Sequence, residues 1–308
     1  MQNDNKIQNL NNDEIDIKDL VLFIWSRKFF ITILTSFAAV ISVIYALSLP
    51  NIYTSKALLS PVNENTSLTS QLAGMSTLAR LGGVNIGSGG TSPSKEAIER
   101  MKSYEFFENH FLPNIKLENL LAAKGWDSST DMIIYNQKIY DGVSKKWTRK
   151  VKPPLDKQPS NQEAYEAFKK IFVVSMDIKT DFVTISIKHL SPNIAKKWLD
   201  IIIFNINEKM REEDRKLALD SINFLNKSSE ETNLVEIKEA ISQLLQSEMQ
   251  KLMLAAANEN YIYKKLESPI APEKKSEPKR SLICILGTIL GGMFGVLITI
   301  IQYSRRNT

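Results

Sequence analysis

Residues 29–49 read FFITILTSFAAVISVIYALSL, and residues 282–303 read LICILGTILGGMFGVLITIIQY. Neither stretch contains a charged residue. At about 1.5 Å of rise per residue, a helix of either length spans the roughly 30 Å hydrocarbon core of a bilayer. Buried helices of soluble proteins seldom run this far without a charge. The two stretches therefore predict two transmembrane helices, one near each end of the 308-residue chain.

A secretory signal peptide is the alternative explanation for the first stretch. The residues before it include five acidic side chains, whereas a signal peptide starts with a positively charged region. The apolar run also exceeds the roughly 7–15 residues of a signal-peptide core. Leu49-Pro50-Asn51, which follows, makes a poor cleavage site. We therefore expect an uncleaved membrane anchor.

Basic residues beside the spans indicate the orientation of the chain, and the two spans disagree. Arg27 and Lys28 abut the first span on its N-terminal side, and only Lys56 lies close on the other side, which places the N-terminus in the cytoplasm. More basic residues precede the second span than follow it: Lys274, Lys275, Lys279 and Arg280 against Arg305 and Arg306. Because the first span usually sets the topology, we expect both tails, residues 1–28 and 304–308, in the cytoplasm.

The segment between the spans, residues 50–281, is large enough to bury a core of its own. We expect it outside the cytoplasm, in a periplasmic space. The formal net charge of +5 divides into −1 for residues 1–49, +4 for residues 50–281 and +2 for residues 282–308. This balance is too weak to indicate a nucleic-acid-binding protein. The only cysteine, Cys284, lies in the second span, so packing without a disulfide must hold the exported domain together.

The exported domain alternates strand-like and helical patterns, which predicts an α+β fold. We expect a first strand over residues 52–59 and a flexible loop over 63–94, where six of the 12 glycines fall. Further elements are predicted in this order: a helix from Ser92 to about Phe111, short strands and turns over 125–160, a helix over 162–170, and a hairpin of strands 171–178 and 182–189.

A long helical region follows, because residues 193–268 contain neither Gly nor Pro. Ser191 and Pro192 provide an N-cap and a first-turn proline. Residues 207–216 are almost wholly charged, so we expect them to be exposed, bridging, or packed against copies of the chain. After a break at 227–232, apolar residues recur at spacings of three or four and form one stripe: Leu234, Ile237, Ile241, Leu245, Met249, Leu252 and Ala256.

These patterns predict an elongated domain. Joined without a bend, the two helices would exceed roughly 95 Å, far more than the width of a compact domain of this size. We therefore expect an α/β base built from residues 50–190 and 259–281, with an extended helical arm over residues 191–258.

The sequence offers no convincing catalytic residues. The two histidines, His110 and His189, have no Cys or carboxylate at metal-ligand spacing. Gly82 and Gly87 have the spacing of a phosphate-binding loop, but the Lys and Ser/Thr that should follow are absent. We expect a protein that is not an enzyme and that uses no cofactor or metal.

The second span and the segment before it carry the residues that we single out. Gly287, Gly291 and Gly295 repeat every four residues and form a strip on one helix face, which allows another helix to approach closely. Glycine is also common in membrane helices without such a role. Three prolines before the span remove backbone donors and fix φ, so the chain should enter the membrane in a stiff, extended form: Pro269, Pro272 and Pro278.

This arrangement resembles the Wzz-type chain length determinant family, the polysaccharide co-polymerases of Gram-negative inner membranes. The most specific part is the proline-rich segment that runs into the glycine-bearing second span, residues 269–295. Glu277 departs from the family pattern, because a serine is usual before Pro278. Four shorter stretches also carry the resemblance: IDIKDL at 15–20, WSRK at 25–28, YTSKA at 53–57 and QLAGMSTLA at 71–79.

The resemblance implies an inner-membrane protein with both termini in the cytoplasm and a periplasmic α/β base that carries a long helical arm. It further implies assembly into a homo-oligomeric ring. Members of the family are not enzymes. They set the modal length of a polysaccharide, usually the O antigen of lipopolysaccharide, that a separate membrane polymerase makes from lipid-linked glycan.

Two other hypotheses stay open. One is a capsule or exopolysaccharide export component that works with a separate tyrosine kinase. Such a protein would belong to the same family but act on a different polysaccharide. A neighbouring kinase gene would favour it, whereas a neighbouring O-antigen polymerase gene would favour the O-antigen regulator. A two-span sensor or enzyme is the third hypothesis, and it would need a ligand-binding or catalytic cluster that the sequence does not display.

Overall fold

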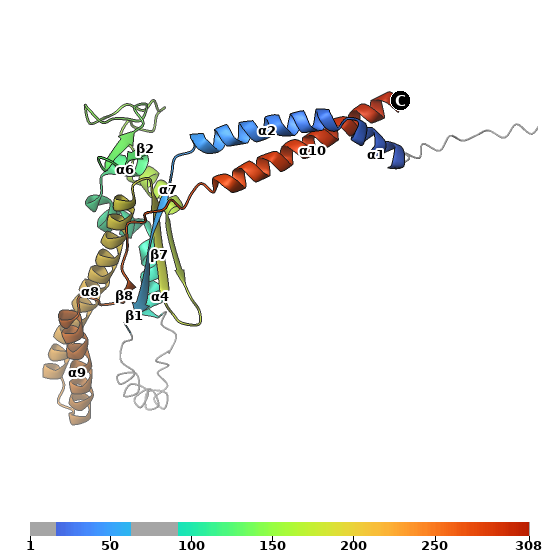
Figure 1. The fold of residues 1–308 in the computed structure, drawn as a ribbon. Coiled ribbons are helices and arrows are strands. Elements are labelled where there is room, and N and C mark those ends of the chain that lie inside the picture. Colours follow the sequence, from blue (N-terminus) through green and yellow to red (C-terminus); the bar gives the residue numbers. More distant parts are fainter. Residues whose placement is uncertain (1–16, 63–91, 308) are drawn as a thin grey trace, which may run out of the picture. The chain divides into compact units, whose positions relative to one another are not determined.

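The computed structural model of the chain describes residues 17–62 and 92–307 (Figure 1). The chain forms two compact units, one made of Met1–Pro50 with Glu277–Thr308 and the other of Asn51–Ser276. Helices and strands are mixed between two apolar helices, so the predicted fold class is confirmed. Residues 63–91, which hold the six glycines of the predicted flexible loop, lie outside the described residues.

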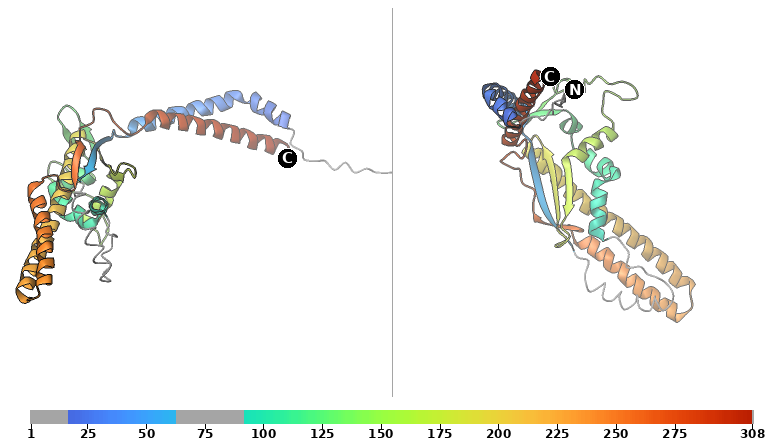
Figure 2. Two further views of the ribbon diagram at one scale, coloured as in Figure 1. Left: turned by 90° about the horizontal axis from the view of Figure 1, so that it is seen from below. Right: turned by 90° about the vertical axis from the view of Figure 1, so that its right-hand side faces the viewer.

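The described residues of the first unit form three helices: α1 (Ile17–Ser26), α2 (Lys28–Ser48) and α10 (Arg280–Asn307). α2 and α10 lie side by side (Figures 1 and 2). Both are long and apolar enough to cross a membrane, with a mean hydropathy of 2.3 in each. α1 was not predicted. Its Phe23 ring packs near the Tyr303 ring of α10, with 5.3 Å between ring centroids.

A four-stranded antiparallel sheet lies at the centre of the second unit. Its strand order is β6 (Phe172–Met176), β7 (Val183–His189), β1 (Tyr53–Pro61) and β8 (Tyr263–Glu267). The predicted β6–β7 hairpin is confirmed, and Asp181 in its turn has a φ of 57°. Alternate residues of β7 are buried, as expected for a strand with one face on the core. β1 pairs with both β7 and β8, so the first and last strands of the unit are neighbours.

Helices cover the buried face of this sheet and form the core with it. They are α4 (Pro93–Lys102), α7 (Asn161–Ile171) and the first half of α8 (Pro192–Glu231). Ser92, Ser160 and Ser191 cap the three helices, and each side chain accepts a hydrogen bond from a first-turn backbone N–H. Aromatic rings fill the space between helices and sheet: Phe107, Phe111, Phe168, Phe172 and Trp198.

The helix predicted from Ser92 to Phe111 is interrupted, because Ser103 adopts an extended conformation. The Ser103 side chain accepts a hydrogen bond from the backbone N–H of Phe106 and so starts a second helix. Short pieces then follow: α5 (Tyr104–Phe106), the π-helix η1 (Phe107–Phe111) and the 3₁₀ turn η2 (Leu112–Asn114).

The predicted mixture of short strands and turns over 125–160 is also confirmed. α6 (Leu117–Leu121) precedes this region, which contains the hairpins β2 (Ala123–Asp127) with β3 (Met132–Tyr135) and β4 (Tyr140–Asp141) with β5 (Lys146–Trp147). Arg149 fastens the end of this region, because its guanidinium binds the Glu163 carboxylate and two backbone carbonyls. The predicted helix over 162–170 corresponds to α7.

The second half of α8 leaves the core, and α9 (Val235–Ala257) returns along it (Figures 1 and 2). Met210 is the last residue of α8 that belongs to the core. Among the described residues of α8 beyond it, Ala218 is the only buried one. α8 runs through the predicted break at 227–232, and the chain turns at residues 232–234 instead. The polar run Lys227–Glu231 thus continues the helix, since serine, lysine and glutamate are compatible with helical geometry when exposed.

One detail of the predicted arm is wrong. The stretch 207–216 is not wholly exposed, because Asn207 and Met210 are buried and Glu213 forms an ion pair with Arg100 at 2.7 Å. The apolar stripe predicted on α9 is present but only partly buried, since Ile241 is buried whereas Leu234, Ile237 and Met249 are exposed. A spacing of three or four identifies a helix face but not which of two adjacent apolar faces will be covered.

Candidate functional site

The predicted glycine strip of α10 lies against α2. A Cβ atom built on Gly287 would lie 2.4 Å from Cβ of Ser42, and one on Gly291 would lie 2.3 Å from Cβ of Ala38. Carbon atoms in contact are normally about 3.5–4.0 Å apart. The two helices can approach this closely only because both positions lack a side chain.

The other two glycines of this span are in less crowded positions. A Cβ on Gly295 would lie 3.3 Å from Cγ2 of Ile31, which is a tight contact. A Cβ on Gly292 would meet Oγ1 of Thr35 at 3.6 Å, an ordinary van der Waals distance. The predicted residues Gly287, Gly291 and Gly295 therefore share one closely packed face, and Gly292 lies beside it.

Arg280, the first residue of α10, binds the end of α2. Its Nε donates to the carbonyl of Ala46 at 3.0 Å, and one terminal nitrogen donates to the carbonyl of Leu49 at 3.2 Å. Carbonyls at a helix C-terminus have no partner within the helix and carry partial negative charge, so a guanidinium is favourable there. Arg280 thus joins the two apolar helices where α2 ends and α10 begins.

The proline-rich segment has no regular secondary structure, and its residues differ in burial. Pro269 is buried, whereas Pro272 and Pro278 are partly buried. The chain runs beside the start of β1, where the Ser55 hydroxyl donates to the carbonyl of Ile270 at 2.8 Å. The backbone N–H of Ser276 also donates to the carbonyl of Ile52 at 2.8 Å. These bonds fix the segment to the sheet.

Asn207 is a structural residue that the sequence analysis missed. It is 4% exposed, and its amide fixes the chain where it returns from the arm. Oδ1 accepts from the backbone N–H groups of Ile262 and Tyr263 at 2.8 and 2.9 Å, and Nδ2 donates to the carbonyls of Ile203 and Tyr263 at 3.0 and 3.2 Å. An asparagine amide offers two donors and two acceptor lone pairs, so every position is used. No sequence signal separates Asn207 from the polar residues that follow it.

Tyr263 completes this connection. Its side chain is fully buried, and its hydroxyl donates to the carbonyl of Ser94 at 2.5 Å. Burial raises the pKa of Tyr263 to about 12, so the phenol is neutral over the physiological range. β8, α4 and α8 therefore meet at two polar side chains in an otherwise apolar core.

The two histidines have structural surroundings. His189 is buried, its Nδ1 accepts from the backbone N–H of Ser191 at 2.9 Å, and its Nε2 therefore donates to the carbonyl of Asn119 at 3.0 Å. Burial lowers the pKa of His189. Burial and the charge of Lys209 lower the pKa of His110. Within residues 17–62 and 92–307, no group of three or more His, Cys, Asp or Glu side chains could hold a metal ion.

The arm exposes large apolar side chains on both of its helices. Phe224, Leu234, Val235, Met249 and Met253 are each more than half exposed. Where such side chains form one contiguous patch, the patch is typical of a surface that another molecule covers.

Comparisons with known proteins give one family match. Residues 13–111 match the family model described as Wzz, chain length determinant protein, which confirms the resemblance stated from the sequence. Residues 15, 16 and 71–79, which carry part of that resemblance, lie outside the described residues. No curated protein matches the chain.

Solved structures that are similar to the chain include two polysaccharide co-polymerases. One is a full-length bacterial polysaccharide co-polymerase, with 15% sequence identity, coverage of 95% of this chain and 99% of that chain, and a TM-score of 0.41. The other is a fragment of WzzB, a polysaccharide co-polymerase from Salmonella Typhimurium, with 14% identity, coverage of 74% of this chain and 100% of that chain, and a TM-score of 0.31.

Proposed function

We propose that this chain, which resembles the Wzz chain length determinant family, regulates the length of a polysaccharide, the O antigen of lipopolysaccharide. The observation that carries the proposal is the family match over residues 13–111. The matched range includes α1, α2, β1 and α4. It thus extends from the first apolar helix into the α/β base.

The proposal includes a two-pass arrangement in the bacterial inner membrane. α2 and α10 would cross the bilayer, residues 50–281 would lie in the periplasm, and both tails would be cytoplasmic. Two observations support this arrangement: both helices are long and apolar enough to cross a membrane, and the close contact at Gly287 and Gly291 makes them a helix pair. Arg27 and Lys28 favour a cytoplasmic N-terminus.

In this proposal the protein is a non-catalytic scaffold of several copies that works beside a separate polymerase. The exposed apolar side chains of the arm support self-association, because burying apolar surface contributes about 25 cal/mol per Å². Copies that meet through their arms would form the homo-oligomeric ring. Measuring the mass of the purified full chain in detergent, by light scattering, tests this part separately: a monomer at micromolar concentration would contradict it.

The function is tested by deleting the gene in its own host and separating the lipopolysaccharide on a gel. We expect the modal O-antigen band to be replaced by a broad distribution, and plasmid-borne wild-type chain to restore it. Unchanged O antigen would contradict the proposal. Unchanged O antigen together with an altered capsule or secreted polysaccharide would identify the alternative, an export component that works with a separate kinase.

A further inference from the structure

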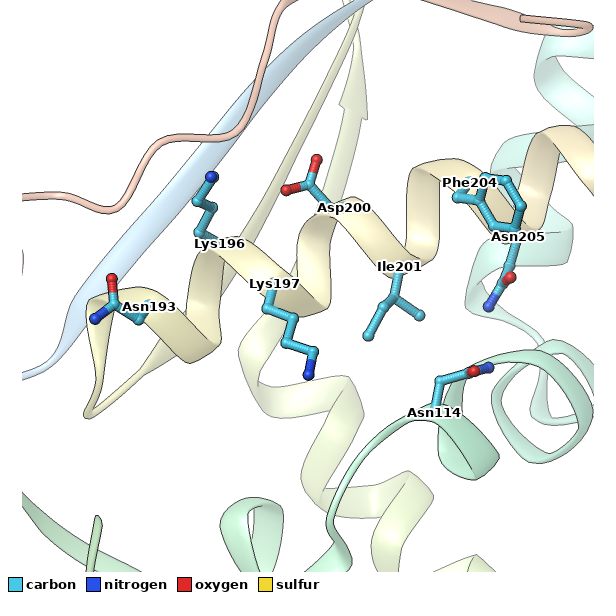
Figure 3. Close-up of a pocket in the computed structure, with 8 residues that line it drawn as sticks. All are labelled: Asn114, Asn193, Lys196, Lys197, Asp200, Ile201, Phe204 and Asn205. Atoms are coloured by element: carbon cyan, nitrogen blue, oxygen red, sulfur yellow. The ribbon is translucent and has the colours of Figure 1, made fainter. Parts of the chain in front are cut away.

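An open groove with a volume of about 550 Å³ runs along the exposed side of α8, next to η2 (Figure 3). This volume is within the range of about 300–1,000 Å³ that is usual for small-molecule sites. Residues four apart on a helix share a face, and two such rows line the groove. They are Asn193, Lys197, Ile201 and Asn205 in one row and Lys196, Asp200 and Phe204 in the other, with Asn114 contributed by η2.

Phe204 stands out among the apolar residues of this part of α8. Its side chain is 64% exposed, whereas Ile202, Ile203 and Ile206 around it are buried in the core. The ring therefore gives the groove an apolar face that the chain itself does not cover. An aromatic ring in this position can pack against the C–H face of a pyranose ring, because its own face carries partial negative charge.

Two asparagine amides are held beside this ring by one backbone carbonyl. Nδ2 of Asn114 donates to the carbonyl of His110 at 2.9 Å, and Nδ2 of Asn205 donates to the same oxygen. His110 lies in the π-helix η1, a conformation often found at functional sites. Both amide orientations are thereby fixed. Among the described residues neither Oδ1 atom has a hydrogen-bond partner, so both can accept hydrogen bonds from a ligand.

The charged residues of the groove can also bind a polar ligand. Asp200 forms an ion pair with Lys265 at 3.1 Å. Lys196 and Lys197 are exposed, and within the described part of the chain neither has an ion-pair partner. Their ammonium groups can donate hydrogen bonds to ligand oxygens. An apolar helix or an acyl chain in this groove would leave the amides and ammonium groups without partners, which costs free energy.

From this combination we infer that the groove binds a segment of the polysaccharide chain. Sugar hydroxyls would donate to the amide oxygens of Asn114 and Asn205 and accept from Lys197, while one ring packs on Phe204. This inference rests on the proposed function for the identity of the glycan. It adds a location: the exposed side of the first half of α8, apart from the far end of the arm.

Binding is measured with the full chain in lipid nanodiscs and with lipid-free polysaccharide released from the host's own cells by mild acid. Isothermal titration gives the Kd. Phe204→Ala should weaken binding about tenfold, because it removes the stacking face. The control is Ile178→Ala, which removes an exposed apolar side chain (94% exposed) from the turn between β6 and β7, outside both the groove and the arm. It should leave the Kd unchanged.

Equal affinity of Phe204→Ala and wild type would overturn the inference, and so would an equal loss in Ile178→Ala. Because Phe204 is exposed, its replacement should not unfold the domain, and a circular dichroism melting curve checks this. This binding experiment tests the groove separately from the proposed function. If gene deletion abolishes length control but Phe204→Ala binds normally, the function stands and the groove is rejected.

Discussion

Replacing Gly291 by alanine should force α2 and α10 apart. The new methyl group would lie 2.3 Å from Cβ of Ala38, with Thr35 Cα a further neighbour at 3.5 Å. Carbon atoms need about 3.5 Å, so the helices must separate by roughly 1 Å along this face. Both neighbours belong to the helix framework and cannot rotate away. Overpacking of this kind costs about 1–3 kcal/mol.

The neighbouring glycine provides a matched control. Alanine at Gly292 would meet Thr35 Oγ1 at 3.6 Å, a normal contact, so Gly292→Ala should change the stability of the helix pair by less than about 0.5 kcal/mol. Both variants add one methyl group to the same turn of the same helix. A difference between them therefore reports on packing against α2 and not on helix propensity or hydrophobicity.

The assay is unfolding of the full chain in mixed micelles with increasing sodium dodecyl sulfate, followed by circular dichroism. Gly291→Ala should lower the midpoint, and the additional change Ala38→Gly should recover most of the loss, because it removes the opposing methyl group. In cells, Gly291→Leu should shift or abolish the modal polysaccharide length while the protein still inserts. Equal destabilisation by Gly291→Ala and Gly292→Ala, or no recovery by Ala38→Gly, would refute the packing argument.

Three further predictions concern the base and its junction with the membrane helices. Asn207→Ala should lower the free energy of unfolding of the domain by about 2–5 kcal/mol, because it leaves two buried backbone N–H groups without an acceptor. The control is Asn223→Ala at an exposed position of the same helix, which should have almost no effect. Chemical denaturation compares the two variants. The Arg149 guanidinium lowers the pKa of Glu163 from 4.5 to about 2, so the pair stabilises the fold above pH 4.5 and this contribution disappears as the pH falls toward 2. The free energy of unfolding of the wild type should therefore exceed that of Glu163→Gln by about 1–3 kcal/mol at pH 7, after allowance for partial exposure, and by almost nothing near pH 2. A difference that does not change with pH would contradict this. Arg280→Gln should destabilise the helix pair by about 0.5–2 kcal/mol in the detergent titration, and Arg280→Lys should recover only part, because an ammonium group cannot bind the carbonyls of Ala46 and Leu49 with a planar fork.

Local sequence rules predicted the elements that depend on local interactions. The apolar runs correspond to α2 and α10, and Ser191-Pro192 starts α8 as expected. The strand predicted over 182–189 corresponds to β7. In each case the signal comes from residues close together in the sequence, where capping, periodicity and hydrophobic length act directly.

Long-range pairing decided the features that sequence reasoning did not find. Asn207 lies in a charged stretch and is buried because the chain returns 55 residues later and offers Ile262 as a partner. Which face of α9 contacts α8 depends on the turn at residues 232–234. The groove beside Phe204 requires η2 and α8 to lie close together, and no residue near Phe204 in the sequence predicts that contact.

The central claim is that this chain determines polysaccharide length. Its most direct test is to express the chain in a strain that keeps its O-antigen polymerase but lacks its own length regulator, and to separate the lipopolysaccharide by gel electrophoresis. We predict that the broad distribution of chain lengths collapses into a modal cluster that appears only when the chain is expressed. A distribution that stays broad, with the protein present in the inner membrane, would contradict the account.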